Sequence, residues 1–453
     1  MARVVIVGAG VSGLTVAYRL RQRDPACDVV VLEADSATGG KLRSVEVGGL
    51  VLPAGADSFL ARKPWAVELC RELGIGGELV EPRASGAYLW TERGLVPYPT
   101  GTAFGIPGDL GDVFRWPGVS RAGRRRALAD LWKHKRREAG DVSLGSVLRR
   151  RFGDEATDRA IAPLLAGLYA GDVDELSIRA TFPELLAWEA AQGSLLRGAQ
   201  AAVRRASKAE AGPMFLKPRA GVQRLTDELA ARLGDGVKIG TAARHVERRD
   251  ERWRVATQSD SIDADAVVLT SNPAQLLPAG PAATELAEIR SVSTGGVLLV
   301  YPAGTGARLP AGSGFVVPRG AAPMTACTWL SSKWPDPSYG DRAVLRCFVG
   351  AAGEEDILEA PDEDLIDACT RHLAALLPLP KRADHVAVVR WPNAMPQYAV
   401  GHLERVERIR STLPAGIFVT GQSLDGVGIA DCVRAAGETA EGVADAIRLE
   451  VRA

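Results

Sequence analysis

The chain has 453 residues, 46% of them hydrophobic, and its 55 basic and 55 acidic side chains give a formal net charge of zero. This composition predicts a globular protein of two or more domains and argues against bulk binding of nucleic acid. Six cysteines without a C-x-x-C pair and only five histidines argue against a metal site, and the lack of a signal peptide or a long apolar run predicts a cytoplasmic protein, with peripheral membrane contact left open.

The amino terminus predicts a dinucleotide-binding unit. The apolar run Val4–Val7 is typical of a buried parallel strand, and Gly8, Gly10 and Gly13 then fit G-x-G-x-x-G. The helix that follows offers free N–H groups to a phosphate. A second strand leads to Glu33, about 20 residues past the last glycine, where an acid that binds ribose belongs. The predicted contacts are Gly8, Ala9, Gly10, Val11, Ser12, Gly13, Glu33 and Ala34.

The residues after Glu33 indicate which dinucleotide is bound. Gly39-Gly40-Lys41 resembles the second signature of the amine-oxidase-like flavoproteins, which NAD-dependent dehydrogenases do not usually carry. This resemblance implies FAD, with Gly40 passing close to the cofactor and Lys41 reaching its phosphate or ring. We also expect Lys41 to stabilise the reduced flavin, as a hypothesis.

A loop with the sequence GADSFLARKP follows a short strand. In the same superfamily this loop runs along the flavin, so Gly55, Ala56, Asp57 and Ser58 are expected to supply backbone and short polar contacts. The alternative is an ordinary Asp/Ser turn.

Residues 100–200 are predicted to be mainly helical. Within them the run 121–137, RAGRRRALADLWKHKRR, is strongly basic. Such a run is either a solvated helix face or a docking patch for anionic lipid or an acidic partner.

The region 221–272 predicts a return to the first domain. Leu225, Leu229 and Leu233 form one stripe of an amphipathic helix. Residues 237–257 predict a pair of strands in a hairpin, and 261–273 predict one strand that leads into a turn. In the superfamily, the residue at Val246 touches adenine through its backbone; the alternative is a residue that only fills the strand.

Three apolar runs between residues 290 and 390 predict a second sheet over the flavin. The segment 390–402, RWPNAMPQYAVGH, contains two prolines and is predicted to be irregular. Its large side chains, Trp391, Tyr398 and His402, either close a core or line a pocket.

The carboxyl-terminal region predicts a strand at Ile417–Thr420, a glycine-rich loop and a long alanine-rich helix. In flavoproteins of this class such a loop returns to the flavin, and the helix amino end faces the pyrimidine side of the ring. Val427, Gly428 and Ile429 are the predicted backbone contacts. Cys432 is predicted to be a buried thiol.

Taken together, these segments resemble the Gram-positive-type coproporphyrinogen III oxidases, relatives of protoporphyrinogen oxidase within the FAD amine-oxidase-like superfamily. The resemblance covers nearly the whole chain, and Trp391 then lies against the cofactor. The more specific segments, in chain order, are GADSFLARKP, VPYPTGTAFGIP (96–107), PLLAGLYAGDVDELSIRATFPEL (163–185), AMPQYAVGH (394–402) and LDGVGIADCV (424–433).

The resemblance implies an α/β fold with a discontinuous Rossmann-like FAD-binding domain, a mixed-sheet substrate domain and a helical insertion. The expected FAD-binding domain comprises 1–85, 214–290 and 396–453. The substrate-binding domain comprises 86–99 and 291–395, and the mainly helical domain 100–213.

The implied reaction is oxidation of coproporphyrinogen III to coproporphyrin III in haem biosynthesis. It takes three two-electron rounds with O₂ as acceptor and releases H₂O₂. No catalytic base is assigned, and Lys63, Arg219 and His402 are weaker candidates for carboxylate partners. Transient contact with a ferrochelatase is left open.

Alternatives remain. Eukaryotic protoporphyrinogen oxidases tend to carry an arginine just after a Pro-x-Gly, where this chain has Thr102 and Ala103, which favours the four-propionate substrate. An FAD amine oxidase is a weaker alternative, because the loop at 424–432 has no paired aromatics. A carotenoid desaturase is another weaker alternative, for which a more lipophilic entrance is expected. A flavin-bound porphyrin carrier without oxidase activity is the alternative from another class. LPAGADSF also departs from the family, which often has an acid before this loop.

Overall fold

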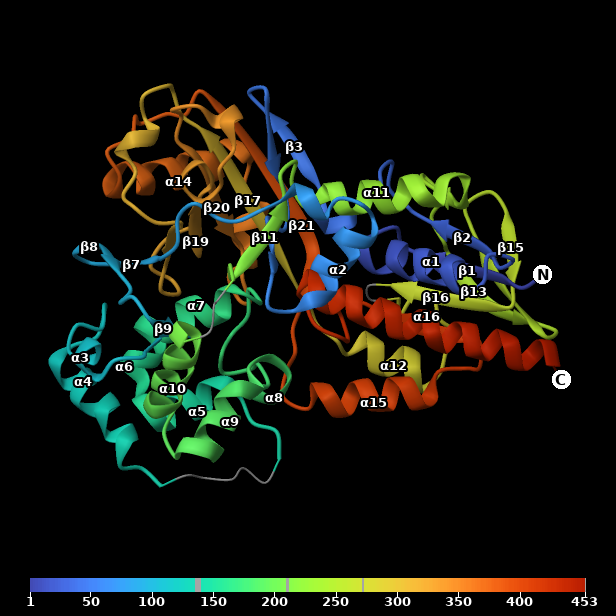
Figure 1. Cartoon of the computed structure of the whole chain (residues 1–453), viewed down its shortest axis with the longest axis horizontal. Helices are drawn as coiled ribbons and strands as arrows, with labels where there is room; N and C mark the ends of the chain where they lie inside the picture. Colours follow the sequence, from blue (N-terminus) through green and yellow to red (C-terminus); the bar gives the residue numbers. More distant parts are fainter. Residues whose placement is uncertain (135–139, 209–211, 271–272, 453) are drawn as a thin grey trace.

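A five-stranded parallel sheet forms the half of the molecule at which the chain begins and ends (Figure 1). The computed structural model describes residues 1–134, 140–208, 212–270 and 273–452. Apart from the two-residue edge strand Val237–Lys238, the strands contain continuous apolar runs, as a sheet covered on both faces requires. In spatial order they are β12 (Val237–Lys238), β2 (Asp28–Leu32), β1 (Arg3–Val7), β16 (Ala266–Thr270) and β22 (Ile417–Thr420).

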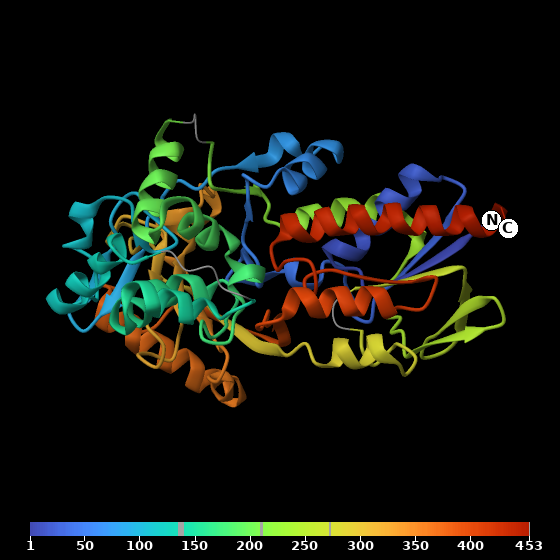
Figure 2. The same cartoon turned by 90° about the horizontal axis from the view of Figure 1, so that it is seen from below.

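Successive residues of these strands point to opposite faces, and each face has its own core. Val4 and Ile6 pack under one layer of helices, whereas Val5 packs on the other side. Figure 2 shows the sheet between these two layers. The first layer contains α1 (Val11–Arg23), α2 (Pro64–Glu72), α11 (Gln223–Leu233) and α16 (Ile429–Arg452). The second contains β13 (His245–Arg249), β14 (Arg252–Ala256), β15 (Ser261–Ala264), α12 (Pro281–Ala287) and α15 (His402–Thr412).

The predictions for 221–273 are confirmed in part. Leu225, Leu229 and Leu233 are buried on one face of α11, and β13 pairs with β14 as an antiparallel hairpin. The single strand predicted at 261–273 is wrong, because Asp265 divides it into β15 and β16. The Asp265 carboxylate accepts the backbone N–H of Arg3 at 2.6 Å, and β16 then pairs with β1 in the main sheet.

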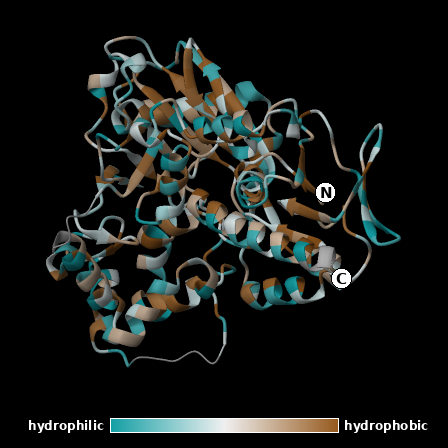
Figure 3. Ribbon diagram, turned by 45° about the vertical axis from the view of Figure 1, so that its right-hand side comes forward, coloured by the Kyte–Doolittle hydropathy of each residue, from teal (hydrophilic) through white to brown (hydrophobic). Residues whose placement is uncertain are grey.

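A seven-stranded mixed sheet forms the upper left part of Figure 1. Helix α14 (Asp362–Leu376) packs on one face, and the hairpin of β3 (Ser44–Val47) and β4 (Leu50–Pro53) packs on the other. Its strands are among the more hydrophobic ribbons in Figure 3. In spatial order they are β21 (His385–Pro396), β17 (Ser291–Val300), β20 (Val344–Val349), β19 (Ala326–Trp329), β18 (Gly314–Val316), β7 (Tyr88–Thr91) and β8 (Gly94–Pro97).

The prediction that 390–402 is irregular is wrong for its first half, which is the end of strand β21. Prolines are tolerated there because β21 is an edge strand with a bulge. Thr294 pairs with Trp391 and Val292 with Met395, so the register shifts between these pairs. Asn393, inside the bulge, has φ of 48°. Strand β21 therefore leads from the seven-stranded sheet to its junction with the parallel sheet (Figure 1).

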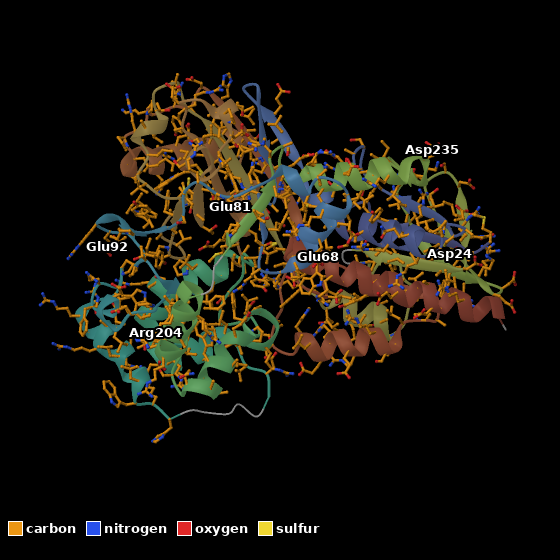
Figure 4. The ribbon with its side chains drawn as sticks, in the orientation of Figure 1. Asp24, Glu68, Glu81, Glu92, Arg204 and Asp235 are labelled. Carbon is orange, nitrogen blue, oxygen red and sulfur yellow. The ribbon has the colours of Figure 1, made fainter. Side chains whose placement is uncertain are left out.

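The region 100–208 is mainly helical, as predicted, and has a core of its own around Trp116 and Phe152. No helix in the described ranges is long and apolar enough to cross a bilayer. Charged side chains of both signs cover the outline of the molecule, from Asp24 on the parallel-sheet half to Arg204 on the helical half (Figure 4). The helices are α3 (Leu110–Val113), α4 (Arg121–Leu128), α5 (Leu144–Phe152), α6 (Asp154–Ala156), α7 (Ala162–Gly167), α8 (Ile178–Thr181), α9 (Pro183–Gln192) and α10 (Leu195–Lys208).

Candidate active site

The glycine turn after β1 is set by close backbone contacts. Gly8 has φ of 103°, and a Cβ built there would lie 2.3 Å from Oγ1 of Thr270. A Cβ on Gly13 would lie 1.9 Å from the carbonyl oxygen of Gly8. Gly10 differs, because no protein atom lies within 4 Å of its Cβ position. Two glycines are thus required by the fold, and the third leaves open space above the start of α1.

Helix α1 begins at this open space. Its N-cap is Gly10, which has no side chain to accept from the first turn, so the N–H groups of Val11, Ser12 and Gly13 are offered to a ligand. Gly39 donates its N–H to the carbonyl of Ala9 at 2.9 Å. The Gly39–Gly40 pair therefore lies directly against the turn.

Glu33 stands at the carboxyl end of β2, beside the turn. One carboxylate oxygen accepts the N–H of Ala9 at 2.8 Å and the other accepts the N–H of Asp35 at 2.9 Å. Two backbone donors hold the carboxylate in the position from which an acid can accept ribose hydroxyls. Ala34, next to it, is exposed.

Lys41 and the loop Gly55–Ser58 lie together. A Cβ on Gly55 would be 1.9 Å from the carbonyl oxygen of Lys41, so only glycine fits there. The Lys41 ammonium donates to the carbonyl of Ala394 at 2.7 Å. Burial lowers the pKa of Lys41 to about 8. Trp391 lies beside the same loop, since its indole N–H donates to the carbonyl of Ala54 at 3.1 Å.

The carboxylate of Asp57 is engaged within the protein. It accepts from Nζ of Lys333 at 2.8 Å and from the indole of Trp334 at 3.3 Å. Burial alone raises its pKa, but Lys333 and Arg346 outweigh burial and lower it to about 2. Arg346 also donates to the carbonyl of Gly55. These two cations fix the loop from the side of the seven-stranded sheet. Sequence reasoning missed them, because no motif marks either residue.

The carboxyl-terminal loop returns to the same place. The hydroxyl of Tyr398 accepts the N–H of Gly426 at 2.7 Å and donates to the carbonyl of Gln422. The Gln422 amide donates to Ala394 at 2.7 Å, the oxygen that Lys41 also uses. Val427, Gly428 and Ile429 follow this anchored loop, and Ile429 begins α16. The sequence did not single out Gln422.

Val246 is fully buried, and its N–H donates to the carbonyl of Leu276 at 2.9 Å. A further backbone contact would therefore come from its carbonyl. Cys432 is a buried free thiol, as predicted. The described residues contain no cluster of His, Cys, Asp or Glu that could hold a metal ion.

The three weaker candidates for carboxylate partners lie in different settings. Lys63 forms an ion pair with Asp431 at 2.7 Å. His402 is 3% exposed and stacks on Tyr398 at 3.9 Å. Burial lowers the pKa of His402 to about 4, so it is neutral at pH 7 and cannot supply a positive charge to a carboxylate. Arg219 is exposed on the rim of a second cavity.

Two cations of the basic run 121–137 donate hydrogen bonds to the carboxyl end of α5. Arg126 donates to the carbonyls of Arg149 and Arg151, and Lys133 to that of Arg150, at the carboxyl end of the helix. Residues 135–137 of the run lie outside the described residues.

A cavity of about 690 Å³ lies between the helical region and the seven-stranded sheet. Thr325 in its wall donates its N–H to the carbonyl of Phe348, whose ring lies 4.2 Å from the guanidinium of Arg346. Because Arg346 contacts Gly55, this wall continues to the loop Gly55–Ser58.

The opposite wall leads to the anchored carboxyl-terminal loop. Ala170 in the wall accepts the N–H of Ala352, and the amide of Gln397 donates to the carbonyl of the preceding Tyr169 at 2.9 Å. Tyr398 follows Gln397 directly. Both walls of the cavity therefore lead towards one candidate cofactor site. We call this site the cradle; it comprises the turn Gly8–Gly13, Glu33, the pair Gly39–Gly40, Lys41, the loop Gly55–Ser58 and the loop before Ile429.

Arginines and acids surround this cavity. Arg149 pairs with Asp174 at 2.7 Å and with Asp158 at 2.8 Å, and Arg319 pairs with Asp172. Arg159 is exposed and has no ion-pair partner among the residues that the structure describes. It is the cation that remains for an anionic ligand.

A parallel sheet with this glycine turn, an anchored acid and a second glycine pair defines a flavin-binding oxidoreductase. The chain belongs to the family of flavin-containing amine oxidoreductases, whose model matches residues 11–444. Its cofactor is accordingly FAD.

Similarity to individual proteins extends over nearly the full length. The chain is 33% identical to a coproporphyrinogen III oxidase of Bacillus subtilis, over 95% of each chain. It is 29% identical to a chloroplastic protoporphyrinogen oxidase of Nicotiana tabacum, over 97% of this chain and 85% of that protein. The crystal structure of a protein described as a putative protoporphyrinogen oxidase of Exiguobacterium sp. 255-15 superposes with a TM-score of 0.89 at 32% identity, covering 98% of both chains.

Proposed function

We propose that this protein oxidises coproporphyrinogen III to coproporphyrin III, with O₂ as the final acceptor and H₂O₂ as the second product. The observation that carries the proposal is the similarity to seven curated relatives of that name, at 29–33% identity over 95–98% of this chain. FAD, when bound, accepts two electrons in each of three rounds.

The cradle fits this cofactor. The open space at Gly10 and the uncapped start of α1 suit a pyrophosphate, and the anchored carboxylate of Glu33 suits a ribose. Gly40, Lys41, Gly55, Ala56, Asp57 and Ser58 would hold the flavin half together with Trp391, Val427, Gly428 and Ile429, and Val246 would contact the adenine. In this proposal the Asp57 side chain positions the loop through Lys333 instead of touching the cofactor.

The chain's own residues bind and orient the tetrapyrrole and exclude water. The cavity between the helices and the seven-stranded sheet is the proposed substrate site, and Arg159 the proposed partner of a propionate. No base is assigned, because aromatisation of the macrocycle favours loss of the pyrrole protons. We propose that 1–85, 214–290 and 396–453 form the FAD-binding domain and that 86–99 and 291–395 form the substrate-binding domain. The mainly helical domain, 100–213, would cover the substrate site.

Protoporphyrinogen IX is the second candidate substrate, because the tobacco relative is named for it. Contact with a ferrochelatase, contact of the basic run with anionic lipid and a cytoplasmic location remain parts of the proposal.

Aerobic oxidation of both porphyrinogens by the purified flavoprotein tests the proposal. Porphyrin fluorescence and peroxide release are followed together. We expect a much larger kcat/KM for coproporphyrinogen III. A larger value for protoporphyrinogen IX would support the second candidate, and no turnover of either by flavin-loaded protein would contradict both.

A further inference from the structure

A second cavity, of about 330 Å³, borders the loop Gly55–Ser58. The hairpin of β3 and β4, the end of β11 (Phe215–Pro218) and the turn at 336–338 enclose it, and Asp57 forms part of its wall. It shares no lining residue with the larger cavity.

Lys217 is the unusual residue in this wall. It is only 6% exposed, and its ammonium has no hydrogen-bond or ion-pair partner in the described part of the chain. Its Nζ lies 5.1 Å from the centre of the indole ring of Trp334. Burial lowers the pKa of Lys217 and the charge of Lys333 lowers it further, whereas the charges of Asp336 and Asp57 raise it. The side chain is nearly buried and its ammonium has no acceptor from the described residues, so an anion in the cavity would be favoured beside it.

The acids in the same wall are already engaged. Asp57 accepts from Lys333 and Trp334, at 2.8 and 3.3 Å. Asp336 accepts from the N–H of Ser338 at 3.0 Å and from its hydroxyl at 2.7 Å. Neither carboxylate forms an ion pair with Lys217.

Arg219 supplies a second cation at the rim of the cavity. Its side chain is exposed and has no hydrogen-bond or ion-pair partner within the described ranges. Together with Lys217 it places one compact and one planar cation around a space that is many times the ~30 Å³ of a water molecule.

We propose that this cavity is a binding site for a small oxyanion, such as inorganic phosphate or a short carboxylate, held between Lys217 and Arg219. Asp57 belongs both to the wall of this site and to the loop Gly55–Ser58. A bound anion would therefore change the electrostatic potential at the flavin. That link rests on the proposed function, whereas anion binding itself does not.

Titration calorimetry of the flavin-loaded protein with phosphate and with malonate tests the site. Lys217→Met keeps the length of the side chain and removes the charge. Lys381→Met, at an exposed lysine, is the matched control. We expect saturable binding to the parent and control proteins, and binding about tenfold weaker to Lys217→Met. Without added anion, the melting temperature of Lys217→Met should equal or exceed that of the parent, because a charge on a nearly buried side chain without an acceptor is gone.

Arg219→Gln is the second variant, at an exposed position, and it should also bind phosphate more weakly. Displacement of phosphate by coproporphyrin would identify the anion as a propionate of the tetrapyrrole; no displacement would identify it as a free anion. An absence of saturable binding to the parent, or equal binding by Lys217→Met, would overturn the proposal. Failure of porphyrinogen turnover would leave these binding results unaffected.

Discussion

The ammonium of Lys41 donates to the carbonyl oxygen of Ala394 at 2.7 Å, joining residues 353 positions apart in the sequence. Gln422 donates to the same oxygen, so the second glycine signature, the end of β21 and the loop after β22 converge on one acceptor. A substitution in any of these three segments is therefore expected to affect the positions of the other two.

The stability of the apoprotein should depend on the titration of Lys41. Its pKa falls from 10.5 to about 8 on folding, so between these values the unfolded chain holds a proton that the folded chain lacks. Stability then rises with pH across this window, by roughly 2–3 kcal/mol. Urea unfolding of the parent and of Lys41→Met should show this rise only in the parent. Parallel pH profiles would contradict the prediction.

Gly10 and Gly13 should respond differently to alanine. A Cβ at Gly13 meets the carbonyl of Gly8 at 1.9 Å, whereas a Cβ at Gly10 meets no protein atom within 4 Å. Gly13→Ala should therefore lower the melting temperature of the apoprotein. Gly10→Ala should leave that temperature unchanged and reduce FAD affinity at least tenfold, because the methyl group fills the space for the pyrophosphate. Normal flavin occupancy in Gly10→Ala would contradict the prediction, because it would show that the pyrophosphate does not bind at Gly10.

The glycine turn could be predicted from sequence because its spacing follows from local geometry. The same holds for the stripe of α11 and for the strand at Ile417–Thr420. The strand character of 390–396 could not, because its prolines are acceptable only on an edge strand, and strand order is a long-range property. Lys333 and Arg346 contact the loop Gly55–Ser58 from a different sheet, and no local sequence pattern predicts such a contact.

The ion pair of Asp57 and Lys333 should stabilise the fold above about pH 4. The pKa of Asp57 falls from 3.8 to about 2, so this stabilisation is fully present above 3.8 and is lost as pH falls to about 2. Asp57→Asn should cost roughly 3–5 kcal/mol at pH 7, because Lys333 is left without its acceptor. Asp57→Asn combined with Lys333→Met should cost less than the sum of the single changes. An additive double-mutant cycle by urea unfolding would show that the two residues act independently.

His402 should make the protein sensitive to mild acid. Burial lowers its pKa from 6.5 to about 4, so stability is greatest above 6.5 and declines as pH falls towards 4. The decline should amount to roughly 3 kcal/mol. His402→Phe keeps a ring to stack on Tyr398 and should remove most of the decline. Unfolding free energies at these two pH values, in both proteins, provide the measurement; an equal decline in both would assign the acid sensitivity to other groups.

Arg159 and Arg149 line one cavity but should differ on mutation. Arg149 pairs with Asp158 and Asp174, so Arg149→Ala should lower the melting temperature as well as activity. Arg159 has no ion-pair partner in the described ranges, and Arg159→Ala should leave the melting temperature unchanged. It should raise KM for coproporphyrinogen III about tenfold with little change in kcat, because a propionate contact made equally in ground and transition states affects binding alone. A fall in kcat at constant KM would instead show that Arg159 acts mainly in the transition state. No change in either constant would show that the propionates bind at another wall of the cavity.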